Sequence, residues 1–368
     1  MKKRAHGPSL YYATDKNVFD ALNQHKVDTP TVMKLFQRRN IIVGKKTQRE
    51  DLAKYFATLT HDYYDHKDIA ARIGIAPRRE RITSMDVTGV SEMDELQVAF
   101  EQLKNELEAA GDAIQISRDG ESLTMHVQYS TVDYKRNEFA QVQVRDGTVE
   151  FVKSPDGYIV RNTQNEYLND VRETLLGKIE KASDAPLTKV VVSLFDVPSP
   201  KLRSKFFHEL VNRLPGYVLR DVTDVNIYKA KPEPDEDDES DDNASSDPDT
   251  HVERVLLRGN GVTRSELLNG LLDEEDYYIT KIGWTATEAK GLGNVYDIEA
   301  VFSDPKDATG FSFILSGVFP VEEGKASTRR RAPHKNEIDA ISRVIEAMSR
   351  DLVAKLRQEF VDSSAGGL

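Results

Sequence analysis

Apolar residues recur every three or four positions through the first 80 residues, which is the spacing of amphipathic helices. Four helices are predicted in this part of the chain, near 17–25, 29–40, 47–59 and 61–73. Thr29 is expected to cap the second helix, with Pro30 in the first turn, where its missing N–H costs nothing. Thr47-x-x-Glu50 predicts a capping box at the third helix, and the β-branched run 41–43 predicts an extended link before it.

From residue 81 the pattern changes to short runs that alternate between apolar and polar residues, separated by long amphipathic helices. Strands are expected near 81–90, 123–129, 139–144, 149–151, 190–195, 222–228, 252–257, 278–285, 295–302 and 311–319, with Asp146-Gly147 as a turn between 139–144 and 149–151. Helices are expected near 91–110, 163–181, 200–214, 263–272 and 336–360. Such an order favours helices packed on one face of antiparallel sheets, so the predicted fold class is α+β.

The predicted organisation is a small all-α N-terminal head followed by two α+β domains with mainly antiparallel sheets. The head covers residues 1–80, the first α+β domain covers 81–230, and the second, which ends in a long helix, covers 251–368. Residues 231–250 separate the two domains and contain 10 Asp and Glu but, apart from prolines, a single apolar side chain. Such a segment buries too little surface to offset its ordering entropy, so we expect a disordered acidic loop.

Charge is distributed unevenly along the chain. The whole protein carries a formal net charge of −12, yet the first 90 residues carry 17 Lys and Arg against 10 Asp and Glu. The acidic segment 231–250 contributes −9, and all remaining residues together contribute −10. Because charges act over roughly 8–10 Å at physiological ionic strength, a polyanionic partner responds to the basic head rather than to the net charge.

The region around the extended link combines several sequence features. They are Thr29-Pro30, the Leu35-Phe36 pair, the Asn40-Ile41-Ile42-Val43 turn, Lys45-Lys46 and Thr47-x-x-Glu50-x-Leu52. Together these features resemble the SAP, or helix–extended-loop–helix, family of small DNA-binding modules over residues 16–58. Asn40 departs from the family pattern, which commonly has glycine in this turn. The resemblance implies two helices that flank an extended loop and bind DNA.

Basic residues on and between these helices are the candidate nucleic-acid-binding residues: Arg38, Arg39, Lys45, Lys46, Arg49 and Lys54. They would contact phosphates and give sequence-independent, salt-sensitive affinity. Lys45 and Lys46 also precede a predicted helix N-terminus, whose N–H groups and dipole favour phosphate. The alternatives are a head that docks on a protein and a merely solvated basic surface. The run Arg329-Arg330-Arg331 is a second basic site or a solvated loop.

The sequence contains no clear reaction signature. His61/Asp65 and Asp62/His66 are i,i+4 pairs that could share a metal ion or form local ion pairs on a helix. Glu288-Ala289-Lys290 could belong to a metal-dependent nuclease with Asp276 as its upstream acid. The turn 259–263 could hold an anion, but it lacks the third glycine of the dinucleotide fingerprint. We therefore predict no metal site and no cofactor, and the absence of cysteine excludes thiolate and disulfide chemistry.

The sequence favours a non-enzymatic, DNA-associated scaffold or recognition subunit of a multi-protein prokaryotic system. Genome maintenance and antiphage defence are general expectations for such a subunit. Its partners would be DNA and other protein subunits, with a homo-oligomer left open. The alternatives are a protein-binding adaptor without nucleic-acid contact and a metal-dependent nuclease or phosphohydrolase.

The surroundings of the protein are also an expectation from sequence. No apolar run approaches 18 residues, so no membrane partner is expected, and the basic start Lys2-Lys3-Arg4 is not followed by an apolar stretch. We therefore expect a cytoplasmic location. The acidic loop could mimic DNA and compete for the head, or it could be a solubilising linker.

Overall fold

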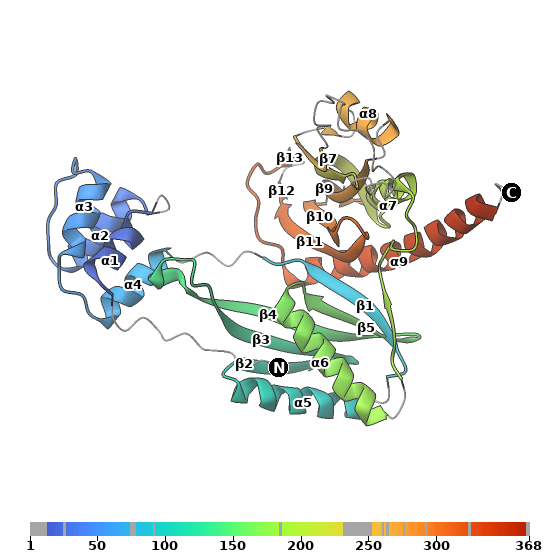
Figure 1. The fold of residues 1–368 in the computed structure, drawn as a ribbon, viewed down its shortest axis with the longest axis horizontal. Helices are drawn as coiled ribbons and strands as arrows, with labels where there is room; N and C mark the ends of the chain where they lie inside the picture. The colour runs from blue at the N-terminus through green and yellow to red at the C-terminus, as the bar shows by residue number, and fades with distance from the viewer. Residues whose placement is uncertain are drawn as a thin grey trace, which may run out of the picture. The chain divides into compact units, whose positions relative to one another are not determined.

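The computed structural model describes residues 13–24, 27–73, 79–90, 93–183, 186–230, 252–259, 261–262, 265–274, 277–290, 293–322 and 325–365 (Figure 1). The segment 231–250, predicted to be disordered, lies outside the described residues. The fold class is α+β, which confirms the prediction, and the described strand pairs are antiparallel. Contacts divide the chain into two compact units, called here the first and the second unit.

The first unit comprises residues 1–79, 91–150 and 170–184. Its described N-terminal residues, 13–73, are called the head. The head contains helices α1 (Asp15–Leu22), α2 (Thr29–Arg38), α3 (Arg49–Ala57) and α4 (Tyr63–Ile73). Each of the helices predicted here is present, with ends that differ by up to a few residues from those expected.

The starts of the head helices differ in detail from the sequence prediction. The Asp28 carboxylate accepts a hydrogen bond from the Thr31 N–H at 2.9 Å, so Asp28 is the N-cap of α2. The predicted Thr29 cap is wrong by one position, because an aspartate one residue earlier is at least as good a cap. The predicted capping box at Thr47 is also wrong, since α3 begins after Gln48, whose side chain makes no capping bond.

The rest of the first unit is an antiparallel meander with a helix beside it. β2 (Ala113–Asp119) pairs with β3 (Ser122–Val132), β4 (Val142–Ser154) follows, and α5 (Met93–Ala109) contacts β2. Every second residue of β3 is buried, as the alternating pattern predicts: Leu123, Met125, Val127 and Tyr129. The short helix η1 (Glu138–Ala140) precedes β4 and contributes Phe139 to the hydrophobic core of the head.

The second unit comprises residues 80–90, 151–169 and 185–368. Its strands pair in the order β5-β1-β11-β10-β9-β7-β8, and β6 also pairs with β1. These strands are β1 (Ile82–Thr88), β5 (Gly157–Thr163), β6 (Thr188–Val191), β7 (Tyr217–Tyr228), β8 (Arg254–Arg258), β9 (Tyr278–Glu288), β10 (Val295–Asp304) and β11 (Thr309–Phe319). A small hairpin follows, formed by β12 (Val321–Glu322) and β13 (Lys325–Ala326). The division between the units runs through β4 and through α6 (Glu166–Ser183).

The core of the second unit is rich in aromatic side chains. Its helices are α7 (Pro200–Asn212), α8 (Glu266–Glu274) and α9 (Lys335–Ala365). α7 packs against both β9 and α9 (Figure 1). Trp284, Phe206, Phe207 and Phe313 are among its largest fully buried side chains. The long helix predicted at 336–360 is α9, and it contributes Ile341, Ile345, Leu352 and Leu356 to this core.

The second unit combines strands from both α+β domains expected from sequence. β1 and β7 fall in the expected domain 81–230, yet they pair with β11 and β9 of the expected domain 251–368. β8 pairs with β7, although the acidic segment separates them in sequence. The structure thus divides the chain differently from the predicted boundaries. Alternating apolar residues reveal where a strand lies, but pairing uses backbone groups that every strand offers, so the pattern does not specify the neighbour.

Candidate nucleic-acid interface

The head is built around two fully buried phenylalanines. Phe36 of α2 and Phe56 of α3 meet edge to face with ring centroids 5.0 Å apart. Tyr55 stacks on Phe36 at 5.6 Å and remains half exposed. α1 and α4 complete this core with residues that include Val18, Leu22 and Ile69. Because α2 and α3 are both anchored in one core, the loop that joins them starts and ends at fixed points.

The turn after α2 is a Schellman motif. Asn40 has φ +56°, the left-handed conformation that glycine usually occupies at this position. The Ile41 N–H donates to the Phe36 carbonyl, and the Asn40 N–H donates to the Gln37 carbonyl, each at 3.0 Å. Asparagine tolerates this conformation better than most residues. The departure from glycine noted in the sequence is therefore compatible with the same turn.

The loop from Ile41 to Gln48 alternates between inward and outward side chains. Ile41 and Val43 pack against the core of the head, whereas Ile42 between them is 97% exposed. The Thr47 N–H donates to the Gly44 carbonyl at 3.1 Å, which closes a tight turn before α3. The extended link that the sequence predicts is present, and its backbone is held at both ends.

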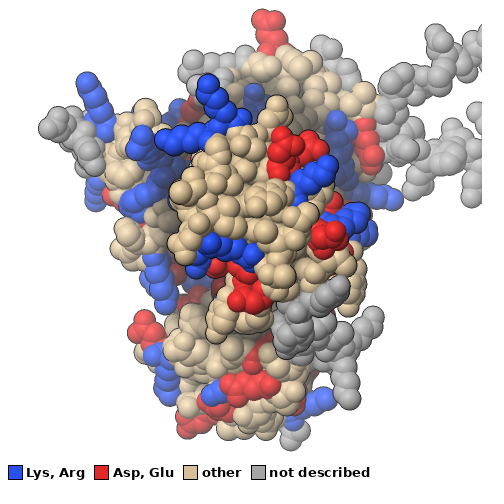
Figure 2. All heavy atoms as spheres, turned by 90° about the vertical axis from the view of Figure 1, so that its left-hand side faces the viewer, with Lys and Arg blue, Asp and Glu red and all other residues tan. Residues whose placement is uncertain are grey.

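Three of the predicted phosphate-binding lysines have exposed side chains. Lys45 and Lys46 lie in the loop, and Lys54 lies on α3. Within the described part of the chain, none of the three forms an ion pair or a side-chain hydrogen bond. Figure 2 shows basic side chains in several separate groups, with acidic side chains next to some of them. These three lysines are therefore open to an external phosphate.

Two predicted phosphate-binding arginines instead hold α2 to α4. Arg38 pairs with Asp68, and Arg39 pairs with Asp65. The guanidinium of Arg39 also lies over the ring of Phe56, 5.0 Å from its centroid. A phosphate would have to compete with a carboxylate that is already in place. Arg38 and Arg39 are therefore close to the loop in sequence, but in the structure both form ion pairs with acids of the head.

Arg49 has an internal role as well. Its Nη1 donates to the carbonyl of Val27 at 2.9 Å and to that of Gln24. Its Nη2 donates to the carbonyl of Asn23 at 3.1 Å. These carbonyls follow the last turn of α1, where a cation is favoured because the helix dipole is negative. Arg49 therefore joins the start of α3 to the end of α1.

Replacing Arg49 with methionine is expected to lower the stability of the head by about 1.5–3 kcal/mol, the range for hydrogen bonds that involve a charged group. The loss should appear as reduced amide protection across residues 13–73 in hydrogen exchange of the full chain. Lys54→Met is the matched control: Lys54 is exposed, so its replacement should lower the stability of the head by no more than about 0.5 kcal/mol. Equal protection in both variants would show that Arg49 does not hold the head together.

Of the predicted His–Asp pairs, His61 and Asp65 both contact Arg39, whereas the ring nitrogens of His66 are buried without a hydrogen-bond partner, so the Asp62/His66 pair is not formed. His61 Nδ1 lies 3.0 Å from Arg39 Nη2, and its Nε2 lies 3.1 Å from the Phe56 carbonyl, so His61 is neutral with its proton on Nε2. His66 is 6% exposed and packs edge-on against Phe139 at 5.7 Å. No group of three candidate metal ligands occurs among the described residues. What the structure does bring together here is a cation, an acid and a neutral imidazole.

Acidification is expected to weaken the head. Burial and then the charge of Arg39 lower the pKa of His61, although Asp65 opposes them and His66 adds to them. Above about pH 6.5, the ordinary histidine pKa, folded and unfolded chains both carry neutral His61 and its contribution is complete. Below that pH the unfolded chain binds a proton that the folded head resists, so stability falls by at most about 1.4 kcal/mol per pH unit for this group.

The measurement is hydrogen exchange of residues 13–73 at a series of pH values between neutral and about pH 5, corrected for intrinsic exchange rates. Protection should decline as the pH falls, and His61→Gln should flatten that decline. A decline as steep in His61→Gln as in the wild type would show that another group causes it.

In the second predicted basic site, Arg330 and Arg331 both form internal ion pairs. Arg330 pairs with Asp297 at 2.6 Å, and its side chain lies directly on Gly317, where any Cβ would collide with it. Arg331 makes a bidentate pair with Glu337 at 2.6 and 2.8 Å, which lowers the pKa of that carboxyl. Arg329 is exposed. The run therefore fastens the segment before α9 to the sheet.

The other candidates from the sequence also have internal partners. Glu288, the acid of the suggested nuclease triplet, accepts a hydrogen bond from the Tyr296 hydroxyl at 2.6 Å. Burial and this bond raise the pKa of Tyr296. The Gly261 N–H donates to the Asp221 carboxylate at 2.9 Å, so this group of the suggested anion-binding turn already holds an acid of the chain. Asp276, the proposed upstream acid, lies outside the described residues.

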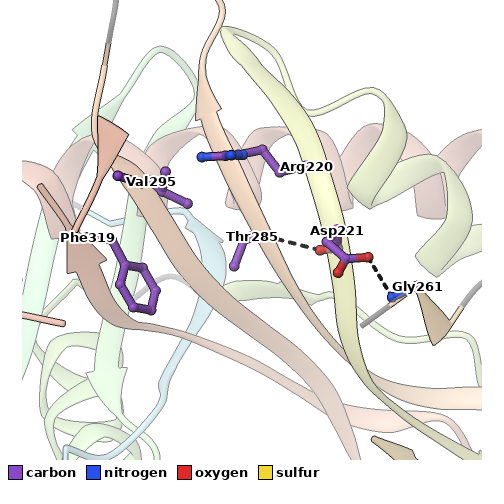
Figure 3. A pocket seen from close by; sticks show the side chains of 7 residues that line it. Arg220, Asp221, Gly261, Thr285, Val295 and Phe319 are labelled. Carbon is purple, nitrogen blue, oxygen red and sulfur yellow. Dashed lines mark hydrogen bonds between the residues drawn. The ribbon is translucent and has the colours of Figure 1, made fainter. Parts of the chain in front are cut away.

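A pocket of about 520 Å³ lies on the sheet of the second unit. It is lined by Arg220, Asp221, Gly261, Thr285, Val295, Phe319 and Ala326. Figure 3 shows Asp221 between Thr285 and Gly261, with the side chain of Arg220 extended over neighbouring strands. Its lining comes from six separate segments with no shared motif, so sequence reasoning missed it.

Comparison with known proteins adds no assignment: no family model and no curated protein matches the chain. Within the part of the chain that the structure describes, every helix is too short or too polar to cross a membrane.

Sequence reasoning also missed Ile42 as a surface feature. The signal that could have found it is the alternation of the run 41–43, since inward residues on both sides force the middle one outward.

Proposed function

We propose that this protein is a non-enzymatic, DNA-associated scaffold or recognition subunit whose head binds the phosphate backbone through Lys45 and Lys46, with Lys54 as a further contact. The observation that carries the proposal is a pair of exposed lysines, without a described acidic partner, in a loop anchored at both ends. We exclude three of the predicted phosphate contacts, Arg38, Arg39 and Arg49, because their guanidinium groups already bind acids or carbonyls of the head.

The proposal is supported by the electrostatics of the loop. Lys45 and Lys46 directly precede α3, whose first turn has no side-chain cap and therefore offers its N–H groups to an acceptor. Glu50 and Asp51 in that turn partly satisfy the helix dipole, so the lysines would supply most of the attraction. Such contacts give affinity without sequence information, as expected of a subunit that is positioned on DNA by a few phosphates.

Two exposed tyrosines favour a second function for the head, protein docking. Tyr63 and Tyr64 of α4 are 49% and 72% exposed, and aromatic side chains are common anchors of protein interfaces. In this alternative the α4 surface would bind another subunit of a multi-protein prokaryotic system, in genome maintenance or antiphage defence. The two functions can coexist, because the tyrosines and the lysine pair belong to different elements.

The test is equilibrium binding of the full chain to a short duplex at low salt, followed by fluorescence anisotropy. Lys45→Glu/Lys46→Glu is expected to reduce affinity by at least about tenfold, since it removes two phosphate contacts and adds two repulsive charges. Lys201→Glu/Lys325→Glu changes the net charge equally at exposed sites of the second unit and should bind like the wild type. No binding by the wild type, or equal loss in both double variants, would overturn the proposal.

A further inference from the structure

Ile42 has the largest exposed fraction among the exposed large hydrophobic side chains of the described residues, 97% against 74% for Tyr134, the next in rank. Its neighbours Ile41 and Val43 pack into the head core, so the chain direction forces Ile42 away from the protein. Single exposed apolar residues are common on protein surfaces and need no explanation by themselves. The position of Ile42 relative to the anchored backbone and to the lysine pair is what distinguishes it.

The backbone presents Ile42 in a fixed geometry. On its N-terminal side the Ile41 N–H is bonded to the Phe36 carbonyl, and Asn40 holds the left-handed turn. On its C-terminal side the Gly44 carbonyl accepts from the Thr47 N–H. Isoleucine is β-branched and stiff at χ1, so little side-chain entropy is lost when it inserts into a partner. Ile42 is thus an apolar point held out from a rigid loop.

We propose that Ile42 is a wedge that inserts between base pairs from the minor groove while Lys45 and Lys46 bind phosphates beside it. This inference rests on the proposed function of the head. Three or four extended residues span at most about 10–14 Å, so the lysines can reach a backbone beside a minor groove that is about 6 Å wide. Isoleucine is among the apolar side chains that partly unstack a base step and bend the duplex in this way.

The charge next to Ile42 favours DNA over a protein groove as its partner. Lys45 and Lys46 are the nearest charged residues C-terminal to it, and no acid lies between Asn40 and Gln48. An exposed apolar side chain whose neighbouring charges in sequence are all positive is complementary to an unstacked base step, because the step is apolar and the phosphates of the two strands lie on either side of it. Pyrimidine–purine steps such as TA unstack most readily, so the wedge should prefer them.

The probe is a short duplex with a central TA step and a fluorescent dye at each end. Wild-type protein should bend it, which raises energy transfer between the ends. Ile42→Ala should lose this change and bind roughly tenfold more weakly, while the dependence of affinity on salt stays the same because both lysines remain. Ile42→Leu should restore bending. Val361→Ala, at an exposed valine of α9, is the control and should behave as the wild type.

The outcomes separate this inference from the proposed function. If the wild type does not bind the duplex at low salt, the proposed function itself fails. If Ile42→Ala binds and bends the duplex as the wild type does, the wedge is wrong and phosphate binding by the lysines stands. Hydrogen exchange of residues 13–73 checks that the head is intact. If Ile42→Ala lowers protection there, Ile42→Leu decides, and failure of an intact Ile42→Leu head to bend DNA would overturn the wedge.

Discussion

Replacing Glu346 with alanine is expected to lower the free energy of unfolding of the second unit by about 3–5 kcal/mol, the usual cost of breaking a buried ion pair on one side. Glu346 of α9 is 1% exposed and Arg161 of β5 is 4% exposed. They form a bidentate pair, with Nε to Oε1 at 2.6 Å and Nη2 to Oε2 at 2.7 Å. Without the carboxylate, a guanidinium charge would remain buried with its counter-ion removed.

The pair belongs to a group of buried polar side chains on the core-facing side of the amphipathic helix α9. Ser342 and Ser349 lie one turn before and about one turn after Glu346, and both are buried. Ile341, Ile345, Leu352 and Leu356 of the same helix enter the core. The buried residues of α9 form one continuous face of the helix, and the ion pair joins this face to β5. Replacing both partners by apolar residues, Arg161→Met/Glu346→Leu, should recover most of the lost stability.

Denaturant unfolding followed by hydrogen exchange of α9 measures this effect. The control is Glu359→Ala, which breaks a pair with Lys205 of similar length, 2.6 and 2.7 Å, on the same helix. The side chains of that pair are 37% and 39% exposed, so its loss should cost no more than about 1 kcal/mol. Similar losses in Glu346→Ala and Glu359→Ala would contradict a central role for the buried pair.

Replacing Phe36 with alanine is expected to unfold the head. A buried phenylalanine replaced by alanine costs about 3–5 kcal/mol, and a core of this size rarely supplies more than that. Phe36 is fully buried and touches both Phe56 and Tyr55 of α3. Its loss separates α2 from α3, so the loop between them would lose its anchors. DNA binding should then be lost although Lys45 and Lys46 are unchanged.

Hydrogen exchange of the full chain reads out this variant. Residues 13–73 should lose protection in Phe36→Ala while the strands of the second unit keep theirs. Tyr55→Ala is the control, because Tyr55 is 51% exposed and contributes mainly one ring contact. Full protection of the head in Phe36→Ala would mean that its core is not the source of its stability.

Periodicity predicted the elements far better than the partners. The α+β class, the head helices and the long C-terminal helix follow from apolar spacing, which is a local property. The pairing of Ile82 with Phe313 and the contact of Arg161 with Glu346 join residues far apart in sequence. Nothing within a short window distinguishes such a partner from many equivalent ones, so neither the units nor the buried pair could be predicted.

The candidate site was also predicted only in part, because long-range partners decide which of its cations are available. Counting charge identified the head as basic, but Arg39 pairs with an acid 26 residues away in sequence, and Arg49 binds carbonyls 22 to 26 residues away. Lys45 and Lys46 have the exposure expected of them, because a short loop between two helices leaves them few neighbours. The sequence therefore located the loop correctly and overestimated the number of its available cations.

The central claim is that the lysine pair of this loop binds phosphates, and the salt dependence of DNA affinity tests it most directly. A plot of log affinity against log salt concentration has a slope of about −0.9 for each phosphate neutralised on duplex DNA. The slope should therefore become shallower by about 1.8 in Lys45→Ala/Lys46→Ala, whereas Lys201→Ala/Lys325→Ala should leave it unchanged. The same slope in the wild type and in Lys45→Ala/Lys46→Ala would contradict the claim.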